Sequence, residues 1–148
     1  MRLKLLIPTT TLILLATVLA TATSGLLSPQ QAGPTDGTIT HSAGIGIYNE
    51  SEATTTCTNI NWGELNPKSS IAKTIYVKNT GNATEILNLE TADWNPTIAA
   101  SVLTLSWDKE NSSLIADQVV AATLTLTMGE DLETVDNFEF NIIIKGYA

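Results

Sequence analysis

The stretch TIYVKNTGNATEILNL, Thr74 to Leu89, decides the fold. Apolar and polar residues alternate up to Val77 and again around Leu87, which is the period of two typical of β-strands with one buried face. The residues between the two runs are types that favour tight turns, namely Asn79, Gly81 and Asn82. The stretch therefore predicts a strand, a polar turn and a returning strand that form a hairpin.

The same period of two continues through the rest of the chain. Along Val119–Met128, apolar residues alternate with residues that are mostly threonine, and a similar pattern covers Phe138–Ile144. Residues Gly37–Tyr48 are predicted to form one strand with its isoleucines on one side. The residues expected on inward faces include Ile39, Ile45, Ile47, Ile75, Val77, Leu103, Leu105, Val120, Ala122, Leu124, Leu126, Met128, Phe138, Phe140, Ile142 and Ile144.

Turn signals separate these runs at a spacing of roughly ten residues, which is the rhythm of a β-sandwich. We therefore expect residues 37–148 to form one all-β domain, an immunoglobulin-like or jelly-roll-like sandwich of about seven or eight antiparallel strands. The tryptophans abut the apolar faces and are expected to fill the core, the alternative being a platform that binds carbohydrate; they are Trp62, Trp94 and Trp107.

The N-terminal segment has the layout of a secretory signal peptide. Arg2 and Lys4 precede an uncharged stretch, and the apolar run ends in Ala20-Thr21-Ala22, a small-x-small site. We expect residues 1–22 to be removed; an uncleaved membrane anchor is the alternative. Both possibilities place the domain outside the cell, with residues 23–36 as a flexible linker.

Charge argues against several classes of partner. The formal net charge is −8, and loss of Arg2 and Lys4 would make it −8 − 2 = −10. A surface this acidic repels nucleic acid and anionic lipid, so the membrane is a partner only if the N-terminal segment stays attached.

The sequence offers no catalytic constellation, so we expect neither an enzyme nor a cofactor. Cys57 is the only cysteine and His41 the only histidine. Cys57 is expected to be a small buried hydrophobe, with pairing to another chain or a free surface thiol as alternatives. The acidic segment 129–137 has enough carboxylates for calcium, but their order is not that of an EF-hand, and a solvated loop is the preferred interpretation.

Acceptor triplets for N-linked sugar occur at predicted turns, where a glycosylating enzyme could reach them. The acceptors are Asn49, Asn82 and Asn111.

The run from Cys57 to Leu89, followed by WNP and LTLSWD, resembles small secreted archaeal proteins with a single immunoglobulin-like β-sandwich. The matching residues are Cys57, Thr58, Trp62, Gly63, Pro67, Val77, Asn79, Gly81, Asn82, Trp94, Asn95, Leu105 and Trp107. The resemblance covers about residues 39–146. It implies a sandwich without catalytic residues. Relatives of similar architecture, the archaeal bundling pilins and thread-like filament proteins, polymerise when the N-terminal strand of one subunit fills a groove in its neighbour.

Two functions follow as hypotheses. The first is an extracellular subunit of a cell-surface filament or surface layer, which assembles head to tail with itself and uses Ile39, Ile45 and Ile47 as anchors of a donated strand. The second is a monomeric secreted or membrane-tethered module for binding or adhesion. For the strand Gly37–Tyr48 itself, pairing within its own sandwich is the preferred interpretation, with exchange as the alternative.

Overall fold

The computed structural model describes residues 34–130, 135 and 137–148, and the predicted signal peptide and most of the predicted linker lie outside them. The elements are β1 (Thr35–His41), β2 (Ile45–Tyr48), β3 (Asn59–Asn61), β4 (Ser70–Asn79), β5 (Glu85–Asn95), α1 (Ala99–Val102), β6 (Leu103–Trp107), β7 (Ser113–Leu114), β8 (Val119–Met128) and β9 (Phe138–Tyr147).

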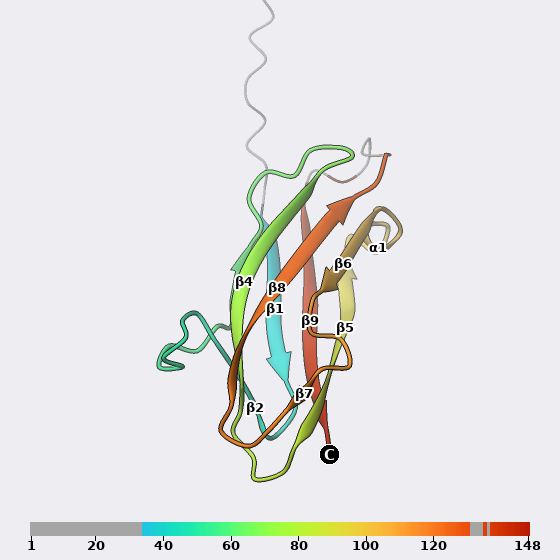
Figure 1. The fold of residues 1–148 in the computed structure, drawn as a ribbon. Helices are drawn as coiled ribbons and strands as arrows, with labels where there is room; N and C mark the ends of the chain where they lie inside the picture. The colour runs from blue at the N-terminus through green and yellow to red at the C-terminus, as the bar shows by residue number, and fades with distance from the viewer. Residues whose placement is uncertain (1–33, 131–134, 136) are drawn as a thin grey trace, which may run out of the picture. The chain divides into compact units, whose positions relative to one another are not determined.

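The strands form two sheets that pack face to face, so the predicted all-β sandwich is confirmed (Figure 1). Sheet A has the strand order β3-β1-β9-β5-β7, and sheet B has the order β2-β4-β8-β6. Sheet B is the layer nearer the viewer in Figure 1. Each sheet hides one apolar face against the other, which is what the period of two requires.

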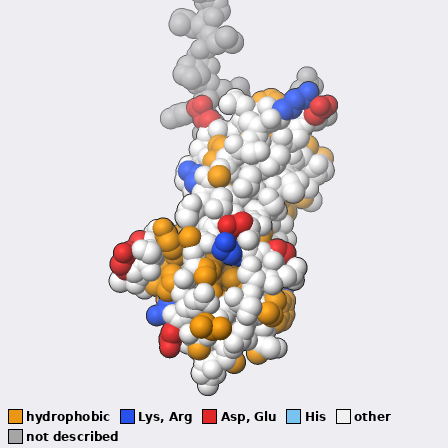
Figure 2. All heavy atoms as spheres, in the orientation of Figure 1, with side chains coloured by type: hydrophobic (Ala, Val, Ile, Leu, Met, Phe, Trp, Pro, Cys, Tyr) orange, Lys and Arg blue, Asp and Glu red, His pale blue; other side chains and the backbone are white. Residues whose placement is uncertain are grey.

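Burial follows the predicted alternation along the long strands. In β8, Leu124 and Leu126 are fully buried, whereas Thr125 between them is half-buried on the opposite face. In β9, Phe138 through Ile144 are buried at every second position. The outer face of sheet B consequently carries few charged side chains over its upper half (Figure 2). Threonine suits such a pleated, solvated face.

Aromatic side chains contribute to the core, as expected for the tryptophans. Trp62 is fully buried, and Trp94 and Trp107 pack against the core from partly buried positions. The rings of Trp94 and Phe140 are stacked, with centroids 4.0 Å apart and planes inclined by 5°. A flat, exposed aromatic platform would need these faces free, and they are engaged with each other.

The prediction of a hairpin at Thr74–Leu89 is wrong. The strands β4 and β5 do form, but β4 pairs with β2 and β8 in sheet B, and β5 pairs with β9 and β7 in sheet A. The turn between them is therefore an arch that crosses from one sheet to the other. Local turn chemistry favours a reversal of the chain, but it does not specify whether the two strands bond to each other.

The prediction of one strand from Gly37 to Tyr48 is also wrong. The chain turns at Ser42–Gly44, so that β1 belongs to sheet A and β2 to sheet B. Gly44 has φ +88°, a left-handed conformation that side chains disfavour, and it allows this corner. We call residues Ser42–Gly44 the corner and residues Asn79–Thr84 the arch.

One pairing departs from the antiparallel arrangement. β1 runs parallel to β9, in register from Thr35 opposite Phe138 to His41 opposite Ile144. All the other strand pairs are antiparallel among the described residues. Because the first and last strands are parallel, β1 begins at the end of the sandwich opposite the one where β9 finishes (Figure 1).

Candidate functional site

Strand β1 is the candidate site for assembly, and it lies within its own sandwich. It bonds to β9 on one side along its whole length and to β3 on the other side over Asp36–Thr38. Ile39 is buried, and its backbone N–H donates to the Thr58 carbonyl at 2.9 Å. The slot for β1 is thus formed by β3 and β9 together with the core beneath them.

Gly37 allows β1 to lie close to the side chains beneath it. A Cβ at Gly37 would lie 2.8 Å from Ile142 Cδ1 and 3.1 Å from Trp62 Nε1, so no larger residue is accommodated without movement. The Trp62 indole N–H is buried and has no hydrogen-bond partner among the described residues. Buried donors of this kind normally have a partner, so Trp62 Nε1 is an exception beneath β1.

The corner joins β1 to the rest of the domain with small residues, backbone bonds and one side-chain bond, in which Ser42 Oγ accepts from the Gly146 N–H at 2.9 Å. The Ser42 N–H donates to the Ile144 carbonyl at 3.0 Å, and the Ile45 N–H donates to the Ser42 carbonyl at 3.2 Å. Gly44 accepts from the Thr80 N–H at 2.8 Å, which ties the corner to the arch. No apolar side chain is buried between Ser42 and Gly44.

The predicted anchors are divided between two strands. Ile39 lies on β1, whereas Ile45 and Ile47 lie on β2, with exposed fractions of 2% and 1%. β2 pairs with β4 over its four residues. An exchanged segment that ends at the corner would carry Ile39 and leave Ile45 and Ile47 in place.

The arch is organised by a buried polar side chain that the sequence analysis assigned only to a turn. Asn79 is fully buried, and its amide donates to the carbonyls of Ala83 at 2.7 Å and Leu114 at 2.8 Å. Its side-chain oxygen accepts from the Gly81 N–H at 2.9 Å. The period of two places Asn79 on the inward face with Ile75 and Val77, so the sequence pattern could have predicted that this side chain is buried.

All three sugar acceptors are exposed in loops. Asn82 lies in the arch, in a triplet whose three residues are all exposed. Asn49 follows β2, and its amide donates to the Thr56 carbonyl at 3.3 Å. Asn111 lies between β6 and β7, with its backbone N–H bonded to the Leu87 carbonyl at 2.9 Å. Of the three acceptors, only Asn49 therefore uses its side chain in a hydrogen bond among the described residues.

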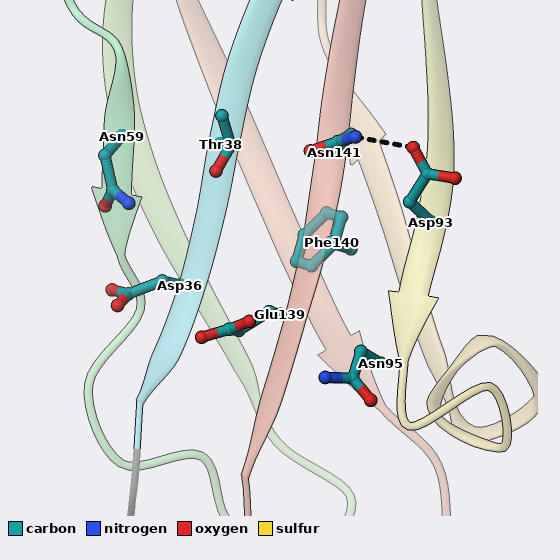
Figure 3. A pocket seen from close by; sticks show the side chains of 8 residues that line it. All are labelled: Asp36, Thr38, Asn59, Asp93, Asn95, Glu139, Phe140 and Asn141. Carbon is teal, nitrogen blue, oxygen red and sulfur yellow. Dashed lines mark hydrogen bonds between the residues drawn. The ribbon is translucent and has the colours of Figure 1, made fainter.

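A polar hollow of about 230 Å³ lies on the outer face of sheet A (Figure 3). It crosses four strands and is lined by Asp36, Thr38, Asn59, Asp93, Asn95, Glu139, Phe140 and Asn141. The amide of Asn141 donates to the Asp93 carboxylate at 2.6 Å, and the amide of Asn61 donates to Asp36 at 3.1 Å. The sequence could not predict this hollow, since it depends on the order of the strands in the sheet.

The hollow owes its shape to an irregularity in β5. The register between β5 and β9 shifts between Ala92 and Asn95, and Asp93 has φ +53°. A bulge of this kind re-aims side chains, and here it turns the Asp93 carboxylate toward Asn141. The lining contains three carboxylates and no lysine, arginine or histidine.

Cys57 is buried, which agrees with its interpretation as a small core residue. Burial raises the pKa of the thiol, and a smaller effect of the Asn59 backbone lowers it. His41 is exposed at the end of β1. A disulfide to another chain would require Cys57 to come to the surface.

The described residues contain no cluster of histidine, cysteine and carboxylate side chains arranged to hold a metal ion. The acidic segment 129–137, for which calcium was considered, lies largely outside the described residues. Within those residues, moreover, no helix has the length and hydropathy needed to cross a lipid bilayer.

Comparison with known proteins yields no match to a family model, a curated protein or a solved structure.

Proposed function

We propose that this chain is an extracellular structural subunit that joins copies of itself head to tail by exchanging β1. The observation that supports the proposal best is the position of β1. It is the first strand, its slot is formed by β3 and β9, and only the corner connects it to the rest of the domain. Because β1 precedes the other described strands, it can leave this slot while they keep their positions.

Exchange conserves the contacts of β1. In the slot of a neighbour, the strand would make the same hydrogen bonds with β9 and bury the same Ile39. The difference in free energy between the closed and exchanged forms is then confined to the corner and to the entropy of association. Opening the corner breaks the bond from the Gly146 N–H to Ser42 Oγ but exposes little apolar surface, because no apolar side chain is buried there.

The direction of the chain favours an open assembly. The start of β1 and the finish of β9 lie at opposite ends of the sandwich (Figure 1). A donated strand makes a head-to-tail contact, and such contacts produce filaments when their rotation does not close a ring. The extracellular location rests on the N-terminal sequence and on the exposed sugar acceptors.

The test is disulfide trapping across β1 and β9. Thr40 and Ile143 lie opposite one another on the outer face, so Thr40→Cys with Ile143→Cys should link the two strands on oxidation. If β1 is exchanged, the link joins different chains, and a non-reducing gel of the secreted protein shows a ladder. A single band of monomer would contradict the proposal.

The matched control is Thr74→Cys with Thr123→Cys. These residues lie opposite one another on β4 and β8, also on an outer face, and neither strand takes part in the exchange. This pair should give only monomer in the same gel. A ladder from the control pair would show that the links arise by collision between chains.

The polar hollow supports a second candidate function, a monomeric binding or adhesion module. Its amides, carboxylates and hydroxyl could bond to a polar ligand such as a glycan. Its volume is below the roughly 300 Å³ at which small-molecule pockets usually begin, so we rank this function second. Binding to a glycan array that is lost with Asn95→Ala would favour it, and binding that Asn95→Ala leaves unchanged would exclude the hollow as the site.

A further inference from the structure

Strand β6 is an edge of sheet B with backbone groups that no neighbouring strand uses. Among the described strands it pairs with β8 alone, from Leu103 opposite Met128 to Trp107 opposite Leu124. The Gly129 N–H donates to the Val102 carbonyl at 2.8 Å, so the backbone at 102 faces β8. Because backbone groups alternate along a strand, those of Leu105 and Trp107 face away from β8.

An apolar recess accompanies this edge. A hollow of about 260 Å³ lies where β5 and β6 separate, and it is lined by Leu89, Leu105, Ser106, Trp107 and Glu110. The Glu110 carboxylate accepts from Trp107 Nε1 at 2.7 Å and from the Leu89 N–H at 3.1 Å. The single charge in the recess is therefore already engaged, and the remaining lining is mostly apolar.

Strand β6 lacks charged side chains, prolines and bulges, features that protect many edge strands from pairing with another chain. Natural edges carry lysine, proline or bulges that prevent pairing with another chain. Residues 97–107 contain no charged residue and no proline, in a chain of net charge −8. Ile98, which precedes α1, is 50% exposed. Between two copies of so acidic a protein, an uncharged edge is where electrostatic repulsion is weakest.

We propose that β6 pairs with β6 of a second copy of this chain, antiparallel and centred on Leu105. The Leu105 N–H of each copy would donate to the Leu105 carbonyl of the other. Leu103 would lie opposite Trp107, and Thr104 opposite Ser106. A strand paired with itself about a two-fold axis satisfies both edges at once, and sheet B becomes continuous across the two molecules.

Side chains favour the same arrangement. Leu105 and Trp107 are partly buried at the margin of the core. Side chains opposite one another in adjacent strands lie on the same face of a sheet, so Leu105 would contact Leu105 of the second copy beneath the joined sheet. This contact would close each recess from its open side. The pairing uses neither β1 nor its slot, so it is independent of the strand exchange proposed above.

The test places charges at two exposed positions of β6. Thr104→Lys with Ser106→Lys sets like charges opposite one another across the two-fold axis, whereas Thr104→Lys with Ser106→Glu sets opposite charges there. Sedimentation velocity of the secreted protein over a range of concentrations measures the mass. The first variant should raise the dissociation constant of the dimer by about tenfold or more, and the second should restore it.

The control carries the same number of lysines elsewhere on sheet B. Ser70→Lys with Thr74→Lys changes two exposed residues of β4, and this variant should associate like the parent protein. A parent protein without a β6-dependent dimer would overturn the proposal. It would equally be overturned if the lysine–glutamate variant failed to regain the dimer, because the register centred on Leu105 would then be wrong.

Discussion

The corner and the arch carry the chain between the same two sheets and lie against each other, yet they are built differently. The corner uses a left-handed glycine, backbone hydrogen bonds and one bond to the Ser42 hydroxyl at its partly exposed surface. The arch is built around the fully buried side chain of Asn79, which bonds to three backbone groups. The corner residues are partly exposed, so groups freed when it opens can bond to water, whereas loss of the buried Asn79 amide leaves a partner unpaired in the interior.

This difference locates the part of the domain that can move. If β1 is exchanged, the corner is the hinge, and the arch holds β4 and β5 in place while β1 leaves. The Thr80 N–H, which donates to Gly44, is the point where the two regions meet. Substitutions in each region should therefore differ in size, and they provide the following tests.

The largest effect is expected at the arch. Asn79→Ala leaves the carbonyls of Ala83 and Leu114 and the N–H of Gly81 without their partner. The free energy of unfolding should fall by on the order of 3–5 kcal/mol, since each group left unpaired in a buried site costs roughly 1–3 kcal/mol. Urea titration measures the change. Asn82→Ala, at the exposed asparagine of the same arch, should cost less than about 0.5 kcal/mol, and equal costs for the two variants would refute the role of Asn79.

The apolar core supplies a benchmark for the arch. Leu126→Ala should lower the free energy of unfolding by about 2–5 kcal/mol through lost burial and the cavity left behind. Thr125→Ala, one residue away on the outer face, should have a small effect in the same titration. The reverse ranking would mean that β8 presents its other face to the core.

A smaller effect is expected at the corner. Gly44→Ala should cost about 1–2 kcal/mol, because φ of +88° brings a Cβ into conflict with its own backbone. Gly44→Asn should cost less, since asparagine tolerates this conformation better. Should the two variants prove equally unstable, the contact of a new Cβ with the Glu85 carboxylate at 3.2 Å would be the cause instead.

The smallest effect concerns Cys57, which belongs to neither connection. Burial raises its pKa in the folded state, so the thiol stabilises the fold below its ordinary pKa of about 8.5. This contribution is lost as the pH rises through the folded-state value, because only the unfolded chain ionises freely. The rate of reaction with a thiol reagent should be low in the native protein and rise on unfolding. Rapid native reaction would place Cys57 at the surface.

Alternation predicted the faces of the strands because it depends only on neighbouring residues. The inward positions of β8 and β9 follow directly from a period of two. Which strands bond to which depends on residues far apart in sequence, and this is why the hairpin at Thr74–Leu89 was assigned wrongly. The parallel pairing of β1 with β9 has the same origin, since it joins the two ends of the domain.

The candidate sites were predictable to different degrees. Exposure of Asn82 followed from turn chemistry, and Ile39 was correctly placed on an inward face. The division of Ile39 from Ile45 and Ile47 could not be foreseen, because a single glycine, Gly44, turns one apparent strand into two. The polar hollow assembles residues from four strands and has no signature within any one of them.

The parallel arrangement of the first and last strands has a mechanical consequence. A force that pulls on the start of β1 and on the finish of β9 acts along both strands, in opposite directions. The hydrogen bonds that residues 35–41 of β1 make with β9 then bear the force together, in shear, instead of opening one after another. If β9 received its β1 from a neighbour, the load would enter β1 at its His41 end and would again act in shear along the same pair of strands. Tension along the line of subunits would fall on the whole length of that seam at once.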